Sequence, residues 1–435
     1  MTPRAAQTPQ PVAATITAVE AARTCWQVLV IGGGPAGAAA ALRLAAGGAR
    51  VLLIDRGGMP RWKVCGCCLS VAAVRELRLL DCGVGDDSKL PFDAVPLESV
   101  CVAHGGRSAV LPLPGGGVVS REILDARLVA AAIAAGCHWL PQAHVAGIDH
   151  GTAGSQQVTA TLTMRPPANA IMTSHVIMAD RIVLATGLAD HVRVAAFDNA
   201  SVAYAPEDDR RIAADNRIGL GATMPADAAD LPFGELVMAV GRDGYCGVVR
   251  LKDGRLDIAA AVSRESLGRH ADPGRVVAAI VAEAVGRSSL PMPTTAALAA
   301  AAFRATPPLT RSAPLVSGPT GQILRCGDAA GYVEPFTGEG IGWALASGRL
   351  VAEALLDNGA GVGCSLRSPA AAAARYREAH HRRFAAVHAR CRRVALALRK
   401  PGVVLAAVQA ARIAPWAAGR LVPAFIGAGS LGGNR

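Results

Sequence analysis

The chain has 435 residues, of which 51% are hydrophobic and 18% charged, so it can bury a large core and is not an intrinsically disordered protein. Its 11 cysteines are odd in number and scattered, which favours a reduced, cytoplasmic chain over a disulfide-rich secreted one. Because no apolar run reaches membrane-spanning length, we expect no transmembrane helix. Residues 1–24 lack a signal-peptide core, and we expect them to form a flexible leader.

The first predicted elements are a buried strand over 27–31, a glycine-rich turn with a helix of small residues, and a second strand over 51–55. Gly32, Gly34 and Gly37 have the spacing of a dinucleotide-binding turn: a tight bend, room for a pyrophosphate, and close packing of helix on strand. Asp55 ends the second strand, where its carboxylate can accept hydrogen bonds from a ribose. The pattern predicts an adenine dinucleotide but does not separate NAD from FAD.

Later segments predict a more complex architecture. Residues 120–137 predict a helix with Ser120 as its N-cap, and 191–310 contain many short strands. Residues 324–356 predict a strand, a glycine-rich loop and a helix. Residues 368–427 predict basic, alanine-rich helices interrupted by prolines.

The two glycine motifs, taken together, resemble those of a known family. With GDAAGYVEPFTGEGIGW starting at Gly327, the chain resembles the flavoprotein monooxygenases of the para-hydroxybenzoate hydroxylase type from about residue 26 to 357. Within them it is closest to the branch of geranylgeranyl reductases and flavin-dependent halogenases. The resemblance implies an α/β fold: a glutathione-reductase-type, Rossmann-like FAD-binding domain with an inserted β-sheet substrate domain and C-terminal helices. The implied parts are FAD-binding segments 25–90, 118–190 and 311–358, substrate-domain segments 91–117 and 191–310, and C-terminal helices 359–435.

The resemblance also implies roles for single residues. Asp328 would bind the ribityl chain of FAD, and Arg121 would lie near its phosphates. Thr186 replaces an aspartate of the family's nicotinamide-linked motif, which leaves NAD(P)H contact open. The remaining positions implied to bind FAD are Arg56, Lys63, Gly327, Pro335, Gly338, Gly340 and Ile341.

The stretch KVCGCCLS, residues 63–70, places three cysteines together. Zinc is disfavoured because Cys65 and Cys68 have no partner pair with metal-ligand spacing, so we predict no metal site. A Cys65–Cys68 disulfide remains open. In the reductase branch a K-x-C-G-x-x-L-S stretch lies against the flavin, which implies that Cys65 faces the flavin or the substrate. We expect Cys67 and Cys68 to be small packing residues.

Tyr245 matches a strand residue that the reductase branch places above the flavin, and with Cys65 it is a candidate catalytic residue. The tryptophan and proline that follow there are replaced near Val248 and Leu251, and the halogenase W-x-W-x-I-P motif is absent. The leading interpretation is therefore an NAD(P)H- and O2-dependent monooxygenase that hydroxylates a lipophilic aromatic, quinone-like or polyketide substrate. The alternatives are an ene reductase acting on an isoprenoid, and a non-catalytic FAD-binding redox protein.

The net charge of +11 is concentrated near the C-terminus, since nine Arg or Lys and one Glu occur between Arg375 and Lys400. No aromatic-rich basic sheet or reading helix accompanies them, so a nucleic-acid partner is not expected. Peripheral contact with an anionic membrane and a merely solvated basic helix both remain open.

Overall fold

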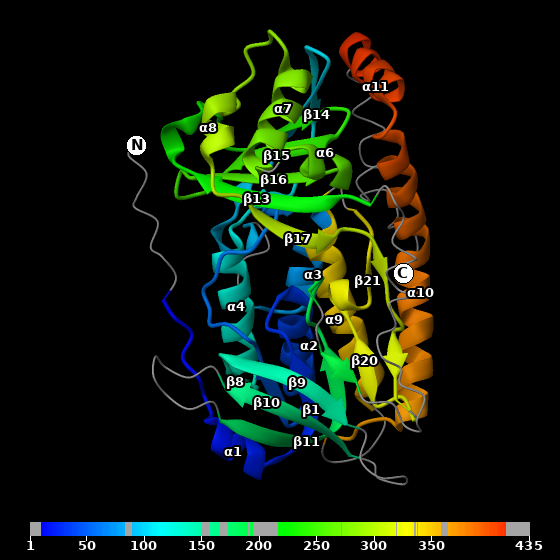
Figure 1. The fold of residues 1–435 in the computed structure, drawn as a ribbon. Helices are drawn as coiled ribbons and strands as arrows, with labels where there is room; N and C mark the ends of the chain where they lie inside the picture. The colour runs from blue at the N-terminus through cyan, green and yellow to red at the C-terminus, as the bar shows by residue number, and fades with distance from the viewer. Residues whose placement is uncertain are drawn as a thin grey trace.

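The computed structural model describes residues 10–82, 89–149, 157–164, 173–189, 192–194, 216–270, 272–318, 320–334, 336, 338–357 and 364–414. Figure 1 shows an elongated molecule, with an α/β layer built on one sheet at one end and a second sheet with its own helices at the other. The α/β fold class predicted above, with its Rossmann-like domain, inserted sheet and C-terminal helices, is confirmed.

The first sheet is mostly parallel around its centre. Its strands run in the order β12-β9-β10-β11-β1-β2-β8, and β20 pairs with β11 and β19. The parallel pairs β1–β2, β1–β11, β2–β8 and β11–β20 place several strand ends at one edge of the sheet. The strands are β1 (Cys25–Ile31), β2 (Val51–Ile54), β8 (His138–Leu140), β9 (Ala143–Asp149), β10 (Val158–Met164), β11 (Ser174–Leu184), β12 (Arg193–Val194), β19 (Val316–Ser317) and β20 (Ile323–Arg325).

Helices α2 (Pro35–Ala46), α4 (Arg121–Ala134) and α9 (Gly340–Leu355) pack together beside this sheet. Alanines and glycines bring α2 close to its neighbours. A Cβ at Gly37 would lie 1.8 Å from the Gly32 carbonyl oxygen, so only glycine fits there. The next helix, α3 (Val71–Leu79), follows a small sheet of β3 (Cys68–Leu69), β4 (Val95–Pro96) and β7 (Gly117–Val118), with η1 (Pro91–Asp93) nearby.

The second sheet has the strand order β17-β13-β16-β15-β14-β5-β6. One face packs on α7 (Pro273–Val285), through a core that includes Val248, Ile258 and Val277. The strands are β5 (Ser99–His104), β6 (Arg107–Pro112), β13 (Ile218–Met224), β14 (Glu235–Val240), β15 (Gly244–Arg250), β16 (Leu256–Val262) and β17 (Arg304–Pro308). The shorter elements are α6 (Arg264–Arg269), α8 (Thr295–Ala300), η2 (Ala226–Ala228), η3 (Gly327–Ala329) and the ladder of β18 (Arg311–Ser312) with β21 (Gly331–Tyr332).

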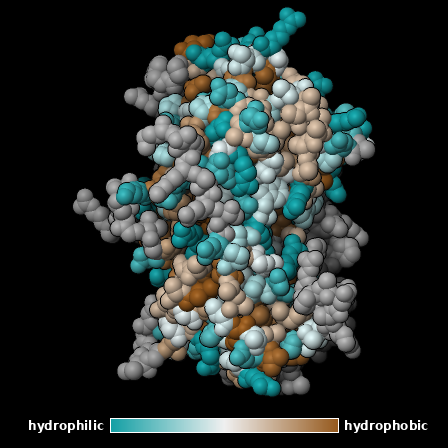
Figure 2. Space-filling view, turned by 90° about the vertical axis from the view of Figure 1, so that its left-hand side faces the viewer, coloured by the Kyte–Doolittle hydropathy of each residue, from teal (hydrophilic) through white to brown (hydrophobic). Residues whose placement is uncertain are grey.

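The C-terminal helix α10 (Pro369–Ala397) runs along the length of the molecule, and α11 (Pro401–Ile413) continues it beside the second sheet (Figure 1). Of the described helices, none alone is long and apolar enough to cross a bilayer, and α10 with α11 would qualify only as a pair bent by 101°. The opposite side of the molecule, which carries α4 and α8, mixes hydrophilic and hydrophobic residues (Figure 2).

Two expectations about chain organisation need correction. The flexible leader expected over 1–24 is wrong for residues 10–24, because α1 (Ala18–Arg23) is closed by a capping box between Thr17 and Glu20 and buries Ala21. Strand β12 was expected in the substrate domain but pairs with β9 in the first sheet. Residues 1–9, and the apolar C-terminal tail from Pro415 onward, lie outside the described part of the chain.

Candidate functional site

A cavity of about 1340 Å³ lies where the carboxyl edge of the first sheet meets the second sheet. Its volume exceeds the roughly 300–1,000 Å³ of a typical ligand pocket, so it has room for a cofactor and a substrate together. The cavity gathers ten of the predicted site residues on its wall: Gly34, Arg56, Lys63, Cys65, Arg121, Tyr245, Asp328, Gly338, Gly340 and Ile341. The predicted Gly32, Gly37, Asp55 and Gly327 lie outside the cavity lining, and Pro335 falls outside the described residues.

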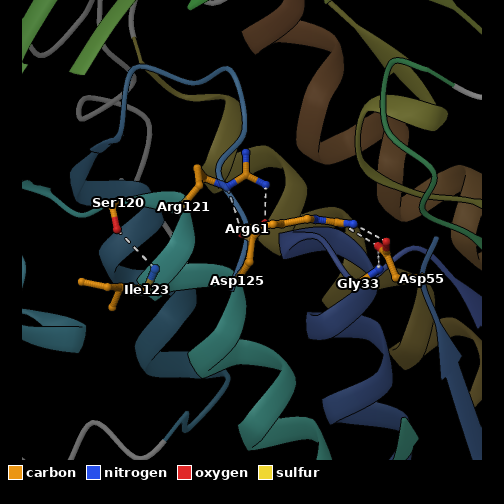
Figure 3. Close-up of polar contacts among 7 residues, drawn as sticks. All are labelled: Gly33, Asp55, Arg61, Ser120, Arg121, Ile123 and Asp125. Carbon is orange, nitrogen blue, oxygen red and sulfur yellow. Dashed lines mark hydrogen bonds and ion pairs between the residues drawn. The ribbon is translucent and has the colours of Figure 1, made fainter. Parts of the chain in front are cut away.

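Asp55 fixes the glycine-rich turn behind that wall. Its carboxylate accepts a hydrogen bond from the backbone N–H of Gly33 at 2.7 Å and forms an ion pair with both terminal nitrogens of Arg61 (Figure 3). It also accepts a hydrogen bond from the Gly57 N–H at 2.8 Å. Burial opposes ionisation, but Arg61 and nearby Lys63 outweigh it and hold the pKa of Asp55 below its usual range. In this arrangement Asp55 organises the turn, and its predicted contact with a ribose stays a prediction.

The turn itself leaves space for an anion. Gly32 has a φ of +111° and faces the Ala185 carbonyl too closely for any side chain. A Cβ at Gly34, by contrast, would meet only Arg121 Nη2, at 3.9 Å. The N-terminus of α2 therefore opens into the cavity and presents its free N–H groups and positive dipole.

Arg121 adds a buried positive charge opposite this turn. Ser120 caps α4 by accepting a hydrogen bond from the Ile123 N–H at 3.3 Å, which places Arg121 in the first turn (Figure 3). Its guanidinium donates to both oxygens of Asp125, at 2.9 and 2.8 Å. Burial and the neighbouring Arg61 and Arg121 lower the pKa of Lys63 to about 8, so this end of the cavity is electropositive at neutral pH.

Asp328 lies in η3 at the start of the second glycine motif and borders the same cavity. Burial raises its pKa to about 6 and the Cys65 thiolate adds to the shift, while Arg121 and Lys63 oppose it. A half-buried carboxylate beside two cations can accept hydrogen bonds from polyol hydroxyls. Gly338, Gly340 and Ile341 follow it along the wall, where α9 begins.

The structure places Cys65, Cys67 and Cys68 on the cavity lining, with Cys67 almost fully buried and all 11 thiols free. The Cys65 thiolate is stabilised by a hydrogen bond from the Cys67 side chain and by Arg121, which bring the pKa of Cys65 to about 6. Cys67 was expected only to pack, yet it is also a cause of the lowered pKa of Cys65. Cys68 is different: burial raises its pKa beyond the normal range, so this thiol of the cavity lining keeps its proton. The expectation that Cys68 only packs stays a prediction.

Tyr245 closes the cavity on the side of the second sheet. Its ring meets Phe336 edge-on with centroids 5.0 Å apart, and Arg217 lies 5.3 Å from the ring centre. Burial and the adjacent Glu334 raise the pKa of Tyr245 well above its usual value, so the phenol keeps its proton. Glu334 is itself held by Arg217 at 3.1 Å and by Arg399 at 3.0 Å.

The cavity becomes apolar away from α2. Strand alternation turns Tyr245, Gly247 and Val249 of β15 toward it, whereas Val248 lies in the core under α7. Helix α11 covers the far end and packs through Val408 and Ala411 on Ala109 of β6. The apolar lining of this end is Val100, Val102, Ala109, Leu111, Leu236, Met238, Val403, Val404, Ala407, Val408 and Ala411.

Together these features fit FAD. The open N-terminus of α2 with its neighbouring cations suits a pyrophosphate, and Asp328 with the start of α9 suits the polyol chain and ring of a flavin. Residues that the sequence reasoning missed include Arg61, Glu334 and Asp257. The sequence did mark Asp257 as unusual, because it is the single charged residue in the apolar strand LDIAAAV.

Comparison with known proteins agrees with this geometry. Residues 26–218 match the family model described as pyridine nucleotide-disulphide oxidoreductase. The chain is 26% identical over 350 residues to a menaquinone reductase of Mycolicibacterium smegmatis, covering 76% of each chain. Over 111 residues it is 40% identical to a chloroplastic geranylgeranyl diphosphate reductase of Oryza sativa subsp. japonica, covering 25% of this chain and 23% of that protein. Among solved structures, the myxobacterial chondrochloren halogenase CndH, an FAD-dependent halogenase, has a TM-score of 0.62 at 19% identity and 92% coverage of both chains.

Proposed function

We propose that this protein, an FAD-dependent flavoprotein oxidoreductase with the fold shared by flavoprotein monooxygenases and halogenases, reduces a carbon–carbon double bond in the isoprenoid chain of a lipophilic substrate. The observation that carries the proposal is the apolar half of the cavity, which is covered by α11 and lined by aliphatic side chains. The names of the two sequence relatives add support, since menaquinone and geranylgeranyl diphosphate both contain an isoprenoid chain.

In this proposal one half of the cavity binds the cofactor and the other half binds the substrate. The α2 end, with Arg121 and Asp328, would hold FAD, which would supply a hydride when reduced. The apolar half binds the chain and excludes water, so that a proton has to come from the protein. Tyr245 and Cys65 both lie on the cavity wall. We infer that Tyr245, whose phenol keeps its proton, delivers that proton, whereas Cys65, a thiolate above about pH 6, would have to take up a proton before it could act as an acid.

The monooxygenase interpretation stays the second candidate, favoured by the likeness of the fold to FAD-dependent halogenases. The structure weakens one argument for the monooxygenase, the replacement of residues near Val248 and Leu251. Val248, near a position where the reductase branch differs, packs under α7, and Leu251 packs in a separate cluster, so neither side chain lines the cavity. The substitutions there do not alter the substrate wall.

A single experiment separates the two candidates. The purified holoenzyme is incubated with either menaquinone or geranylgeranyl diphosphate, and with NADH, NADPH or dithionite as the electron donor. Each reaction is run with and without oxygen, and the masses of the products are determined by mass spectrometry. Reduction adds two hydrogens per double bond and proceeds without oxygen. Incorporation of labelled oxygen, with no product under anaerobiosis, would overturn the reductase proposal and support hydroxylation. The dithionite arm tests the reaction separately from the proposal that NAD(P)H is the donor.

We also propose that the C-terminal helices bring the protein to an anionic membrane surface, where an isoprenoid substrate resides. Part of the basic charge of α10 faces inward: Arg383 approaches Glu76, and Arg390 approaches Glu339. Other basic side chains of this segment, such as Arg392 and Lys400, are exposed and free to meet lipid head groups.

A further inference from the structure

Helix α10 reaches the second glycine motif through a buried tyrosine. The helix runs beside α9 and the end of β20 (Figure 1), and its Tyr376 is fully buried in the same core as Leu324 and Cys326. A buried hydroxyl needs hydrogen-bond partners, because it has given up its bonds to water. The residues described above as fitting FAD all precede Tyr376 in the chain, so its partners bear on whether α10 also belongs to the cofactor site.

Two hydroxyls connect Tyr376 to the backbone at the end of β20. The Gly327 N–H donates to Ser347 Oγ of α9 at 3.0 Å, and the Tyr376 hydroxyl donates to the Arg325 carbonyl at 2.7 Å. The two hydroxyl oxygens lie 3.1 Å apart. Because the Tyr376 proton goes to Arg325, the Ser347 O–H is the donor between the two hydroxyls. The hydrogen bonds therefore form a closed chain that starts at the Gly327 N–H and ends at the Arg325 carbonyl.

This chain of hydrogen bonds lies where the backbone leaves the first sheet. The Cys326 N–H still donates to the Leu184 carbonyl of β11, at 2.9 Å, whereas the next N–H, that of Gly327, turns to α9. Gly327 has a φ of +61°, which favours glycine, and a Cβ there would lie 2.6 Å from the Ala36 Cβ. The backbone therefore changes direction at Gly327, against the first turn of α2.

The bend places Asp328 on the cavity wall. Asp328 follows Gly327 directly and lines the cavity, where it is predicted to bind the ribityl chain of FAD. Ser347 is 2% exposed, and the next residue, Gly348, lies so close to α2 that a Cβ there would be 2.1 Å from the Ala36 carbonyl oxygen. The same short part of α9 thus holds Gly327 on one side and the start of α2 on the other. A change in these contacts should move groups of both glycine motifs.

We propose that Tyr376 is a positioning residue for FAD, which acts through Ser347 and Gly327 to hold the Asp328 carboxylate toward the cavity. Tyr376 and Ser347 both lie outside the cavity lining, so their effect on the cofactor is transmitted by the backbone. Near its other end α10 lines the apolar half of the cavity through Leu398, so one helix supports both halves. The inference rests on the predicted role of Asp328 in binding FAD and not on the reaction proposed above, so each can fail without the other.

Titration of the apoprotein with FAD tests this role. Tyr376→Phe keeps the buried ring and its edge contact with His380 but removes the hydroxyl, and the Kd for FAD should rise about fivefold to tenfold. Ser347→Ala breaks the same chain from α9 and should have a similar or larger effect. Ser263→Ala is the matched control, because its hydroxyl also accepts a hydrogen bond from a backbone N–H, at 3.1 Å, but at the start of α6. An unchanged Kd in Tyr376→Phe would overturn the proposal even if the variant melts at a lower temperature, since a merely structural tyrosine changes stability alone.

A double-mutant cycle shows whether the effect passes through Asp328. In an Asp328→Ala background the carboxylate is already lost, so Tyr376→Phe should raise the Kd for FAD by less than about twofold. An equal rise in both backgrounds would overturn the proposal, because Tyr376 would then act on FAD by another route. Ser347→Ala in the same cycle should behave alike, and it replaces Tyr376→Phe if that variant is too unstable to titrate.

Hydrogen exchange tests the chain of hydrogen bonds without FAD. In the apoprotein the Gly327 N–H should exchange faster in Tyr376→Phe and Ser347→Ala than in the wild type, because its acceptor is loosened or lost. Ser263→Ala should exchange at this position like the wild type. Exchange that neither Tyr376→Phe nor Ser347→Ala accelerates would show that the two hydroxyls do not hold Gly327, and would overturn the proposal.

Discussion

The two ends of the cavity are built differently. At the α2 end, backbone and side chains are locked together, as in the contacts of Asp55 with Gly33, Gly57 and Arg61. At the α11 end, aliphatic side chains from separate strands and one helix make a smooth wall. A locked, polar site accepts one ligand in one pose, whereas an aliphatic wall holds a chain largely through its area. The difference suggests that the cofactor is fixed by the fold, while the range of substrates is open to change.

The largest effect should come from breaking the locked end. Gly37→Ala would drive a Cβ into the Gly32 carbonyl, and we expect a loss of at least about 3 kcal/mol of unfolding free energy together with the bound FAD. Thermal unfolding and the flavin content of purified protein would measure both. Gly58→Ala is the control, because a Cβ there meets nothing within 4 Å. A yellow Gly37→Ala protein with normal stability would contradict this account of the turn.

A smaller effect is expected from Asp328→Ala, which keeps the fold but removes the carboxylate predicted to bind the ribityl chain. Loss of charge-assisted hydrogen bonds should weaken FAD binding by about tenfold to a hundredfold in a titration of the apoprotein. Asp227→Ala makes a matched control, since Asp227 also lies in a 3-10 helix but is exposed and away from the cavity. Equal affinities for the two variants would remove Asp328 from the FAD site.

The aliphatic end can be filled without touching the cofactor. Val408→Trp should raise KM for a long isoprenoid substrate by about tenfold while the Kd for FAD stays constant, because the added ring occupies the wall opposite Ala109. Ala406→Trp places the same ring on the exposed side of α11 and should change neither value. An unchanged KM in Val408→Trp would show that the chain does not lie under α11.

Cys65 lies between the two ends, and its ionisation can be measured as a function of pH. A pKa of about 6 means that Cys65 is a thiolate above that pH, whereas an ordinary cysteine ionises near about 8.5. The rate of Cys65 alkylation in the folded protein should therefore be half-maximal near pH 6, and the same peptide in the denatured chain should need a higher pH. Since the folded pKa is the lower one, the stability from this ionisation is complete above the unfolded pKa and is lost as pH falls through about 6. A midpoint near 8.5 in the folded state would show that Cys67 and Arg121 do not stabilise the thiolate.

The smallest expected effects lie on the outside of α10. Binding to anionic vesicles should weaken with added salt, and Arg392→Ala or Lys400→Ala should each cost about 1 kcal/mol. Arg275→Ala removes an exposed arginine from α7, at another surface, and should have no effect. Identical binding to neutral and anionic vesicles would argue against a charged membrane contact.

The polar α2 end of the cavity could be predicted from the sequence, whereas the apolar α11 end could not. Gly32, Gly37 and Asp55 could be found because a dinucleotide turn requires particular backbone geometry, and such geometry leaves a fixed spacing. The apolar wall could not be assembled in advance, because its residues come from distant segments and any aliphatic side chain suits each position. Asp257 was missed for another reason: its burial depends on strand register, which pairs it with Val249 of the cavity wall. The order in residues 10–24 was missed because a single turn of helix held by a capping box carries too little hydrophobic pattern to predict.

The contacts of Glu334 bear on how this protein could be recombined with its relatives. Glu334 is 1% exposed and joins Arg217 from the start of the second sheet to Arg399 at the end of α10. A chimera that imports foreign C-terminal helices to gain a new substrate range would leave a buried acid short of one of its two cations unless it keeps an arginine at position 399. Such a mismatch costs several kcal/mol, so many exchanged chains would fail before their substrate preference could be seen. Residues 217, 334 and 399 should therefore be inherited as a set, whichever helices are grafted.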